Sequence, residues 1–158
     1  MNIFVLDQDI EKSSQFQVDR HCIKMLLEHQ QILFTVHHVN GTDYSEGVAY
    51  KKAYAHHPCV KWACESKENY LWLVNYNLEC AKEYTYRYGK IHKCQKFSEW
   101  CKEHIPHFEK IERTPFALAM PDECKSDDPV QSYRDYYNKH KRHLFVWKNR
   151  ETPYWIKI

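Results

Sequence analysis

Four polar side chains recur at helical spacing near the start of the chain. Arg20, Lys24, Glu28 and Gln31 follow one another at intervals of four, four and three residues. On a helix, these intervals place a guanidinium, an amine, a carboxylate and an amide along one side. Burial can tune the protonation of an amine beside a carboxylate, and both acid–base and Schiff-base chemistry use such pairs. We therefore predict that Lys24 and Glu28 are catalytic and that Arg20 and Gln31 bind substrate.

The same stripe has an alternative interpretation as a solvated helix face. Exposed pairs at i,i+4 stabilise a helix by only about 0.2–0.5 kcal/mol each. However, Lys24 precedes Glu28, which is the less favourable order, and the rest of this helix is apolar enough to favour a half-buried stripe. The residues expected on its buried side share three- and four-residue spacing: Ile23, Leu26, Leu27, Leu33, Phe34 and Val36.

Two adjacent histidines precede the next helical stretch. His56 and His57 come directly before Pro58, a residue that suits the first turn of a helix, and Trp62 follows one turn later. An imidazole at a helix N-terminus beside an indole would form one wall of a pocket, so we predict that His56, His57 and Trp62 contact substrate. The alternative is that a histidine caps the helix and that Trp62 belongs to the core.

A second polar and aromatic stripe is expected on the last helix, formed by Tyr133, Arg134, Tyr137 and Lys141. We predict that Tyr133, Arg134 and Tyr137 bind substrate, because arginine offers a planar fork for phosphate oxygens and aromatic rings stack on bases. The alternative is that the aromatic rings lie in the core and that Arg134 forms a salt bridge with Asp128 or Asp135.

The sequence indicates neither a metal nor a cofactor. Cys94, Cys101, His104 and His107 superficially resemble a zinc set, but Cys94 and Cys101 would lie about 10 Å apart along a helix, too far for a shared ion. No glycine-rich phosphate loop and no nucleophile elbow is present, which argues against P-loop, Rossmann and α/β-hydrolase proteins.

The apolar spacing predicts an all-α fold. Helices are expected from Asp7 or Asp9 to about Gln17, from an Asp19 N-cap to Asn40-Gly41, from Pro58 to Tyr88 with a break near Ser66, from Cys94 to His104, and from Asp128-Pro129 to Arg142 or Trp147. Residues 2–6 should form a strand or an extended arm, and residues 105–128 should be irregular. We expect a compact single-domain helical fold over residues 1–158, with a short extended N-terminus and a C-terminal tail.

Composition indicates where the protein is found and what kind of partner it binds. The seven cysteines are odd in number and contain no C-x-x-C pair, which favours reduced thiols in the cytoplasm, and no apolar run is long enough to cross a membrane. From residue 124 onward, eight Lys or Arg face four Asp or Glu, interleaved with aromatic residues. We therefore expect duplex DNA or a phosphorylated nucleotide as the partner. Lys outnumbers Arg 17 to 6 and Tyr is abundant, which is typical of an AT-rich genome, such as that of a phage.

Four stretches, in order along the chain, resemble a known family. They are Asp19-Arg20…Lys24…Glu28…Gln31-Ile32-Leu33, His57-Pro58-Cys59-Val60…Trp62, Asp128-Pro129…Tyr133-Arg134, and Pro153-Tyr154. This pattern resembles the pyrimidine-dimer DNA glycosylases, the phage endonuclease V family, and especially its small bacterial and phage relatives. The resemblance implies a compact all-α enzyme that binds and kinks damaged duplex DNA, flips out a base, cleaves the glycosidic bond and nicks the strand.

The resemblance also implies a nucleophile. In the best-known members it is the α-amine of an N-terminal Thr exposed by Met removal, assisted by a Glu on the first long helix. Here Asn2 follows Met1, and Met is usually kept before a residue as large as Asn, so we expect the α-amine of Met1 to serve, with Glu28. The predicted function is a cofactor-free, virus-encoded DNA N-glycosylase, with or without lyase activity. The alternative is a nucleotide-binding counter-defence protein that uses the same pocket without DNA chemistry.

Overall fold

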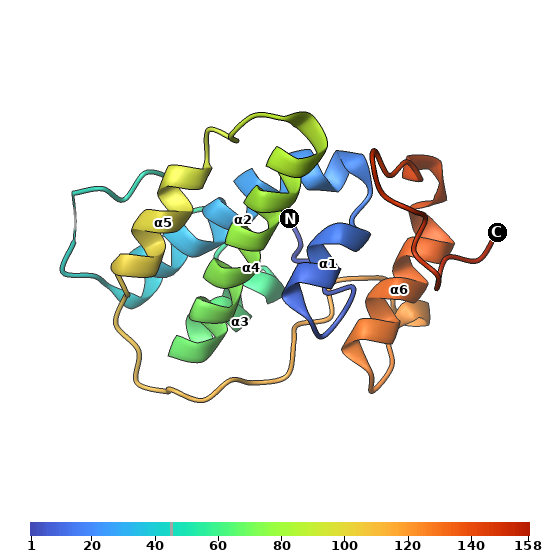
Figure 1. The fold of residues 1–158 in the computed structure, drawn as a ribbon. Coiled ribbons are helices and arrows are strands. Elements are labelled where there is room, and N and C mark those ends of the chain that lie inside the picture. Colours follow the sequence, from blue (N-terminus) through green and yellow to red (C-terminus); the bar gives the residue numbers. More distant parts are fainter. Residues whose placement is uncertain (45) are drawn as a thin grey trace.

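The computed structural model describes residues 1–44 and 46–158, and every regular element among them is helical (Figure 1). The elements are α1 (Ile10–Phe16), α2 (Asp19–Asn40), α3 (Pro58–Glu65), α4 (Lys67–Tyr88), α5 (Gln95–Glu103), the 3₁₀ helix η1 (Asp122–Cys124), α6 (Pro129–His140) and the 3₁₀ helix η2 (Arg142–Leu144). The all-α prediction is therefore confirmed. Apart from η1, residues 105–128 are irregular, as expected.

Helix α2 lies at the centre of the packing and contacts α3, α4 and α5. Leu26, Leu33, Phe34 and Val36 are buried as predicted, in the same core as Met25 and Ile32. The prediction was wrong for Ile23 and Leu27, whose exposed fractions are 42% and 39%. These two residues lie one turn apart beside the Arg20 stripe, on the side of the helix that faces away from the core.

Local capping signals set most of the helix ends. The side chains of Asp9, His57, Ser66 and Asp128 cap α1, α3, α4 and α6, and Gly41 and Gly89 follow α2 and α4. The break at Ser66 is thereby confirmed. Two boundaries were wrong. Val18, not Asp19, is the N-cap of α2, because the Asp19 carboxylate instead accepts a hydrogen bond from Arg87. The last helix ends at His140, since Lys141 leaves the helical conformation and η2 follows.

The segment before α1, predicted to be a strand or an extended arm, forms no strand and no helix. Asn2–Leu6 runs through the interior, where all five residues are buried. The Asn2 side chain donates to the Ala119 carbonyl at 2.7 Å and accepts from the Ile3 N–H at 2.8 Å. Phe4 adopts the left-handed backbone conformation, with φ of 45°. These contacts hold the amino terminus in one place against the helices.

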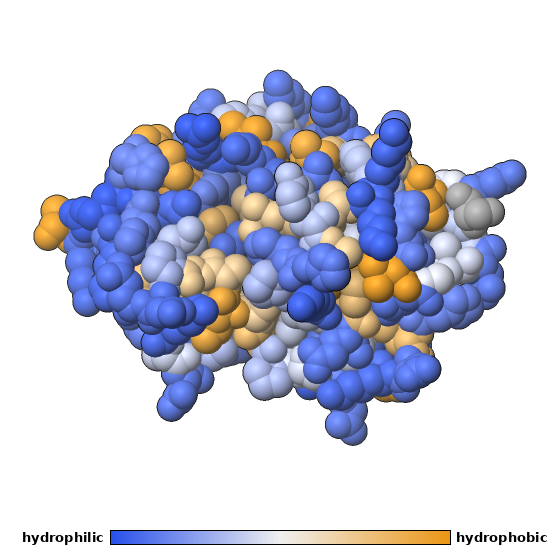
Figure 2. Space-filling model, turned by 180° about the vertical axis from the view of Figure 1, so that it is seen from behind, coloured by the Kyte–Doolittle hydropathy of each residue, from blue (hydrophilic) through white to orange (hydrophobic). Residues whose placement is uncertain are grey.

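The surface is mainly polar. On the face drawn in Figure 2, hydrophilic residues predominate and hydrophobic ones form small separate patches. Among the described residues, no helix combines the length and the apolar character that a membrane span requires. All seven cysteines are free thiols.

Buried histidines make stability depend on pH, and His29 and His37 are two of them. Burial lowers the pKa of His29 to about 3 and that of His37 to about 4, both from 6.5. Both imidazoles are therefore neutral in the fold, and the unfolded chain binds more protons as the pH falls below 6.5. Their contribution to the stability of the fold is fully present above pH 6.5 and is lost as the pH falls toward 3–4.

We expect the free energy of unfolding to fall by about 2 kcal/mol per histidine between pH 7 and pH 5. Urea denaturation at the two pH values measures this change. In His37→Gln the free energy of unfolding should fall by about 2 kcal/mol less, because the contribution of His37 is removed. An equal fall in His37→Gln and the parent protein would contradict this assignment.

Candidate active site

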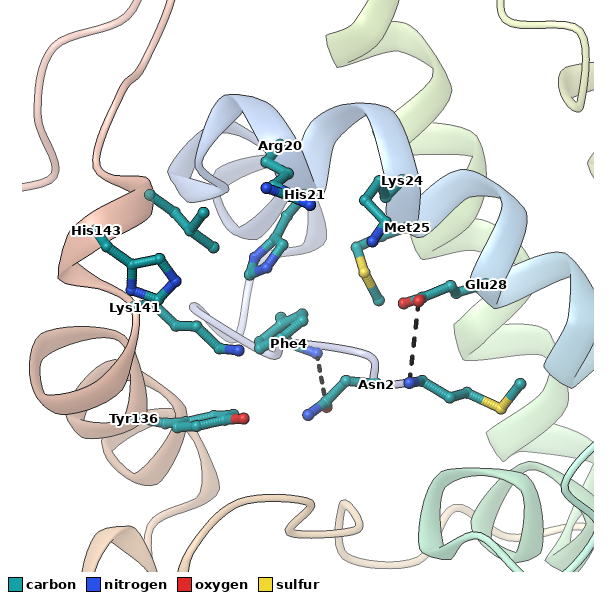
Figure 3. Close-up of a pocket in the computed structure, with 12 residues that line it drawn as sticks. Asn2, Phe4, Arg20, His21, Lys24, Met25, Glu28, Tyr136, Lys141 and His143 are labelled. Atoms are coloured by element: carbon teal, nitrogen blue, oxygen red, sulfur yellow. Dashed lines mark hydrogen bonds and ion pairs between the residues drawn. The ribbon is translucent and has the colours of Figure 1, made fainter.

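A cavity of about 360 Å³ opens between α2 and the C-terminal end of α6 (Figure 3). Three parts of the chain line it: the N-terminal segment, one side of α2, and the stretch from the end of α6 into η2. The lining residues are Met1, Asn2, Phe4, Arg20, His21, Lys24, Met25, Glu28, Tyr136, Lys141, His143 and Leu144.

Three of the four residues in the predicted stripe line this cavity. Figure 3 shows Arg20, Lys24 and Glu28 along α2, on the opposite side from Lys141. Gln31 is half-buried and does not line the cavity. The two intervals of four residues therefore bring the Arg20 guanidinium, the Lys24 amine and the Glu28 carboxylate to one site.

The α-amine of Met1 meets the carboxylate of Glu28 in this cavity. The Met1 nitrogen lies 3.9 Å from Glu28 Oε1, and the exposed fractions of the two side chains are 5% and 26%. This separation is longer than a hydrogen bond, so the contact is an ion pair. Asn2 fixes the position of the amine through its bond to Ala119. An amine and a proton acceptor are thus held together at the edge of the cavity.

An aromatic stack lines the cavity between α2 and α6. The Phe4 ring is stacked on His21, with centroids 4.2 Å apart and planes 16° apart, and it lies 6.0 Å from Tyr136 at 23°. His21 Nδ1 lies 2.6 Å from the Tyr137 hydroxyl. Burial, and then the positive charges of Lys141, Lys24 and Arg20, lower the pKa of His21 to about 3. His21 is therefore a neutral imidazole at physiological pH.

The cavity is electropositive. Lys141 lies over the stack, with its Nζ 5.0 Å from the Tyr136 centroid and 5.9 Å from the Phe4 centroid. Together with Arg20 and Lys24 it provides three cationic side chains, against the single carboxylate of Glu28. This balance favours an anionic ligand such as a phosphate.

The predicted wall of His56, His57 and Trp62 is not part of this cavity. His56 is exposed, and His57 caps α3 by accepting from the Cys59 N–H at 3.1 Å. Trp62 is 3% exposed in the core and donates to the Thr114 carbonyl at 3.3 Å. The alternative interpretation, in which a histidine caps the helix and Trp62 belongs to the core, is therefore correct for His57 and Trp62. Burial lowers the pKa of His57, and the nearby Met1 amine lowers it further while Glu28 opposes the shift.

Of the predicted stripe on the last helix, Lys141 lines the cavity, whereas Tyr133, Arg134 and Tyr137 do not. Tyr133 and Tyr137 are fully buried, and the Tyr133 hydroxyl donates to the Ala117 carbonyl at 2.6 Å. Arg134 donates to the Leu6 carbonyl at 2.9 Å and to Asp7 Oδ2 at 3.0 Å. Its ion-pair partner is thus Asp7 and not Asp128 or Asp135. None of the three lines the cavity, although Tyr137 orients His21.

Sequence analysis missed seven lining residues: Asn2, Phe4, His21, Met25, Tyr136, His143 and Leu144. His21 is adjacent to Arg20, so a search of that helix turn would have found it. Phe4 and Tyr136 carry no local signal, because they lie 132 positions apart and meet only through the fold.

Comparison with known proteins covers the part of the chain that carries the amine and the carboxylate. A family model described as pyrimidine dimer DNA glycosylase matches residues 1–96, from Met1 through α4. Searches of the curated proteins and of the solved structures give no match. The matched stretch contains Met1, Arg20, Lys24 and Glu28, and it exceeds half of the chain. The chain belongs to the pyrimidine dimer DNA glycosylase family.

Proposed function

We propose that this protein excises damaged bases from duplex DNA, with the α-amine of Met1 as the nucleophile and Glu28 as its acid–base partner. The observation that carries the proposal is the 3.9 Å contact between the Met1 nitrogen and Glu28 Oε1 inside an electropositive cavity. Membership of a glycosylase family supports the same reaction class.

The chemistry begins with proton transfer from the amine. Glu28 takes a proton from the Met1 ammonium, and the free amine attacks C1′ of the target nucleotide. The glycosidic bond breaks, and the departing base keeps the electron pair and takes up a proton. Opening of the sugar ring then leaves an imine between Met1 and C1′. Loss of a C2′ proton expels the 3′ phosphate, which is the lyase step, and hydrolysis of the imine restores the amine.

The rest of the cavity suits a flipped nucleotide. Arg20, Lys24 and Lys141 supply the positive charge that phosphates require. Extruding a base from the stack costs a few kcal/mol, and stacking on an aromatic side chain returns about 1–3 kcal/mol. Tyr136, which is partly exposed and lines the cavity, is the aromatic side chain available for this contact.

A second candidate function is binding of a free nucleotide without DNA chemistry. The size of the cavity and its three cationic side chains favour this possibility as well. Salt dependence separates the two candidates. Affinity for duplex DNA should fall steeply with salt, because neutralising several phosphates releases their counterions, whereas a closed nucleotide site should bind mononucleotides and ignore long DNA.

A single added residue tests the role of the terminal amine. Placing one Gly before Met1 moves the α-amine by up to about 3.5 Å from its contact with Glu28. We expect incision of a duplex carrying one cyclobutane pyrimidine dimer to slow by about 100-fold, because misplacement by as little as 1 Å costs that much.

The matched control is the same Gly added after Ile158, a fully exposed residue, which should leave the rate unchanged. Circular dichroism and thermal melting check that both proteins fold alike. Full activity in the protein extended at Met1 would exclude the α-amine as the nucleophile.

A further inference from the structure

Outside the cavity, three side chains with metal-binding donors converge. Glu123 and Cys124 belong to η1, and His140 ends α6. A carboxylate oxygen, a thiol sulfur and an imidazole nitrogen from these residues all lie within 4.8 Å of one another. Among the described residues, no other group of this kind was found.

We propose that Glu123, Cys124 and His140 form a zinc site that joins η1 to α6. A sulfur, a nitrogen and an oxygen donor are the ligand types that Zn²⁺ accepts, whereas Mg²⁺ and Ca²⁺ prefer oxygen alone. Cys124 is 1% exposed and forms the floor of the site. The Glu123 and His140 side chains are 60% and 37% exposed, which leaves a path for the ion and space for water as a fourth ligand.

The two exposed ligands already approach each other. His140 Nε2 lies 2.5 Å from Glu123 Oε1, so a proton now holds the pair together. In a tetrahedral zinc site, neighbouring donors are about 3.3 Å apart, given bonds of about 2.0 Å. The ion would replace that proton, and the two atoms would separate by less than 1 Å. Side chains this exposed can move that far without disturbing the core.

One of the parts that the ion would join lines the cavity, and the other contacts a lining residue. Tyr136, one turn before His140, lines the cavity, and its ring centroid lies 5.8 Å from that of His140. The segment leading into η1 accepts the Asn2 side chain at Ala119. A zinc ion here would therefore fix the end of α6 that carries Tyr136 relative to the segment that holds Asn2. It would be structural, because no ligand of the ion lines the cavity.

Cobalt substitution tests the site without any DNA assay. Co²⁺ added to metal-free full-length protein should bind with one-to-one stoichiometry, giving the visible bands of a tetrahedral ion and a near-ultraviolet thiolate charge-transfer band. Cys124→Ser should lose the charge-transfer band, and His140→Asn should bind at least about tenfold more weakly. Cys64→Ser, which removes a half-buried thiol from α3, is the matched control and should keep both signals.

Thermal melting provides a second readout. Zn²⁺ should raise the Tm of the parent protein and of Cys64→Ser, but not that of His140→Asn, whose altered side chain is too exposed to affect folding. The absence of a thiolate band in the parent protein would overturn the proposal. So would bands, or a Tm shift, that persist unchanged in His140→Asn.

Discussion

Replacement of Glu28 by Gln is expected to slow base excision by at least about 100-fold while leaving the fold intact. General acid–base catalysis contributes about 10²–10⁴-fold, and the amide can neither take the proton of the Met1 ammonium nor balance positive charge on the sugar. Its oxygen would still occupy the position 3.9 Å from the Met1 nitrogen. The variant therefore removes the charge and preserves the shape.

Single-turnover incision of a duplex with one pyrimidine dimer measures this effect. Glu79→Gln is the matched control, because Glu79 is also a partly exposed carboxylate in an ion pair, 3.1 Å from Lys82, but lies outside the cavity. We expect the control to retain the parent rate. A Glu28→Gln rate within a few-fold of the parent would remove Glu28 from the mechanism.

Replacement of Arg87 by Met is expected to reduce the free energy of unfolding by about 3–5 kcal/mol. The Arg87 side chain has no exposed surface and donates to Glu83 at 2.8 Å and to Asp19 at 3.0 Å. It also donates to the backbone carbonyls of Gln15 and Gln17. Removing Arg87 takes the buried cation away from both carboxylates and leaves the buried Glu83 with only the partly exposed Arg150, which is why the loss is large.

Arg150→Met is the control for this prediction. Arg150 binds the same Glu83 carboxylate, at 2.9 and 3.1 Å, but its side chain is 28% exposed. We expect a loss of about 1 kcal/mol or less, as for other solvent-accessible pairs. Urea denaturation at pH 7 compares the two variants. Equal losses in the free energy of unfolding would show that burial does not make the contacts of Arg87 stronger than those of Arg150.

The network also fixes the start of α2, directly before Arg20. We therefore expect Arg87→Met to weaken activity as well.

Local signals in the sequence account for the fold. The ends of α3 and α4 follow from Pro58, Ser66 and Gly89, whose backbone preferences act over a few residues. The stripe on α2 follows in the same way, because four-residue spacing is a property of the helix itself. These features could be predicted without knowing which distant residues are in contact.

Long-range contacts explain what could not be predicted. Asp19 has the right type for an N-cap, but Arg87, 68 positions away, takes its carboxylate. Tyr133 and Tyr137 have the spacing of an exposed stripe, yet they pack into the core because the N-terminal segment covers that side of α6. Which face of a helix is covered depends on the tertiary fold, and spacing alone does not encode it.

The most direct measurement is borohydride trapping of the purified protein on duplexes that carry an abasic site or an ultraviolet photoproduct. Reduction makes an imine between enzyme and sugar permanent, and mass mapping of peptides then identifies the amine. We predict a covalent adduct on the α-amine of Met1. An adduct on Lys24 instead, or no adduct with either duplex, would contradict the mechanism.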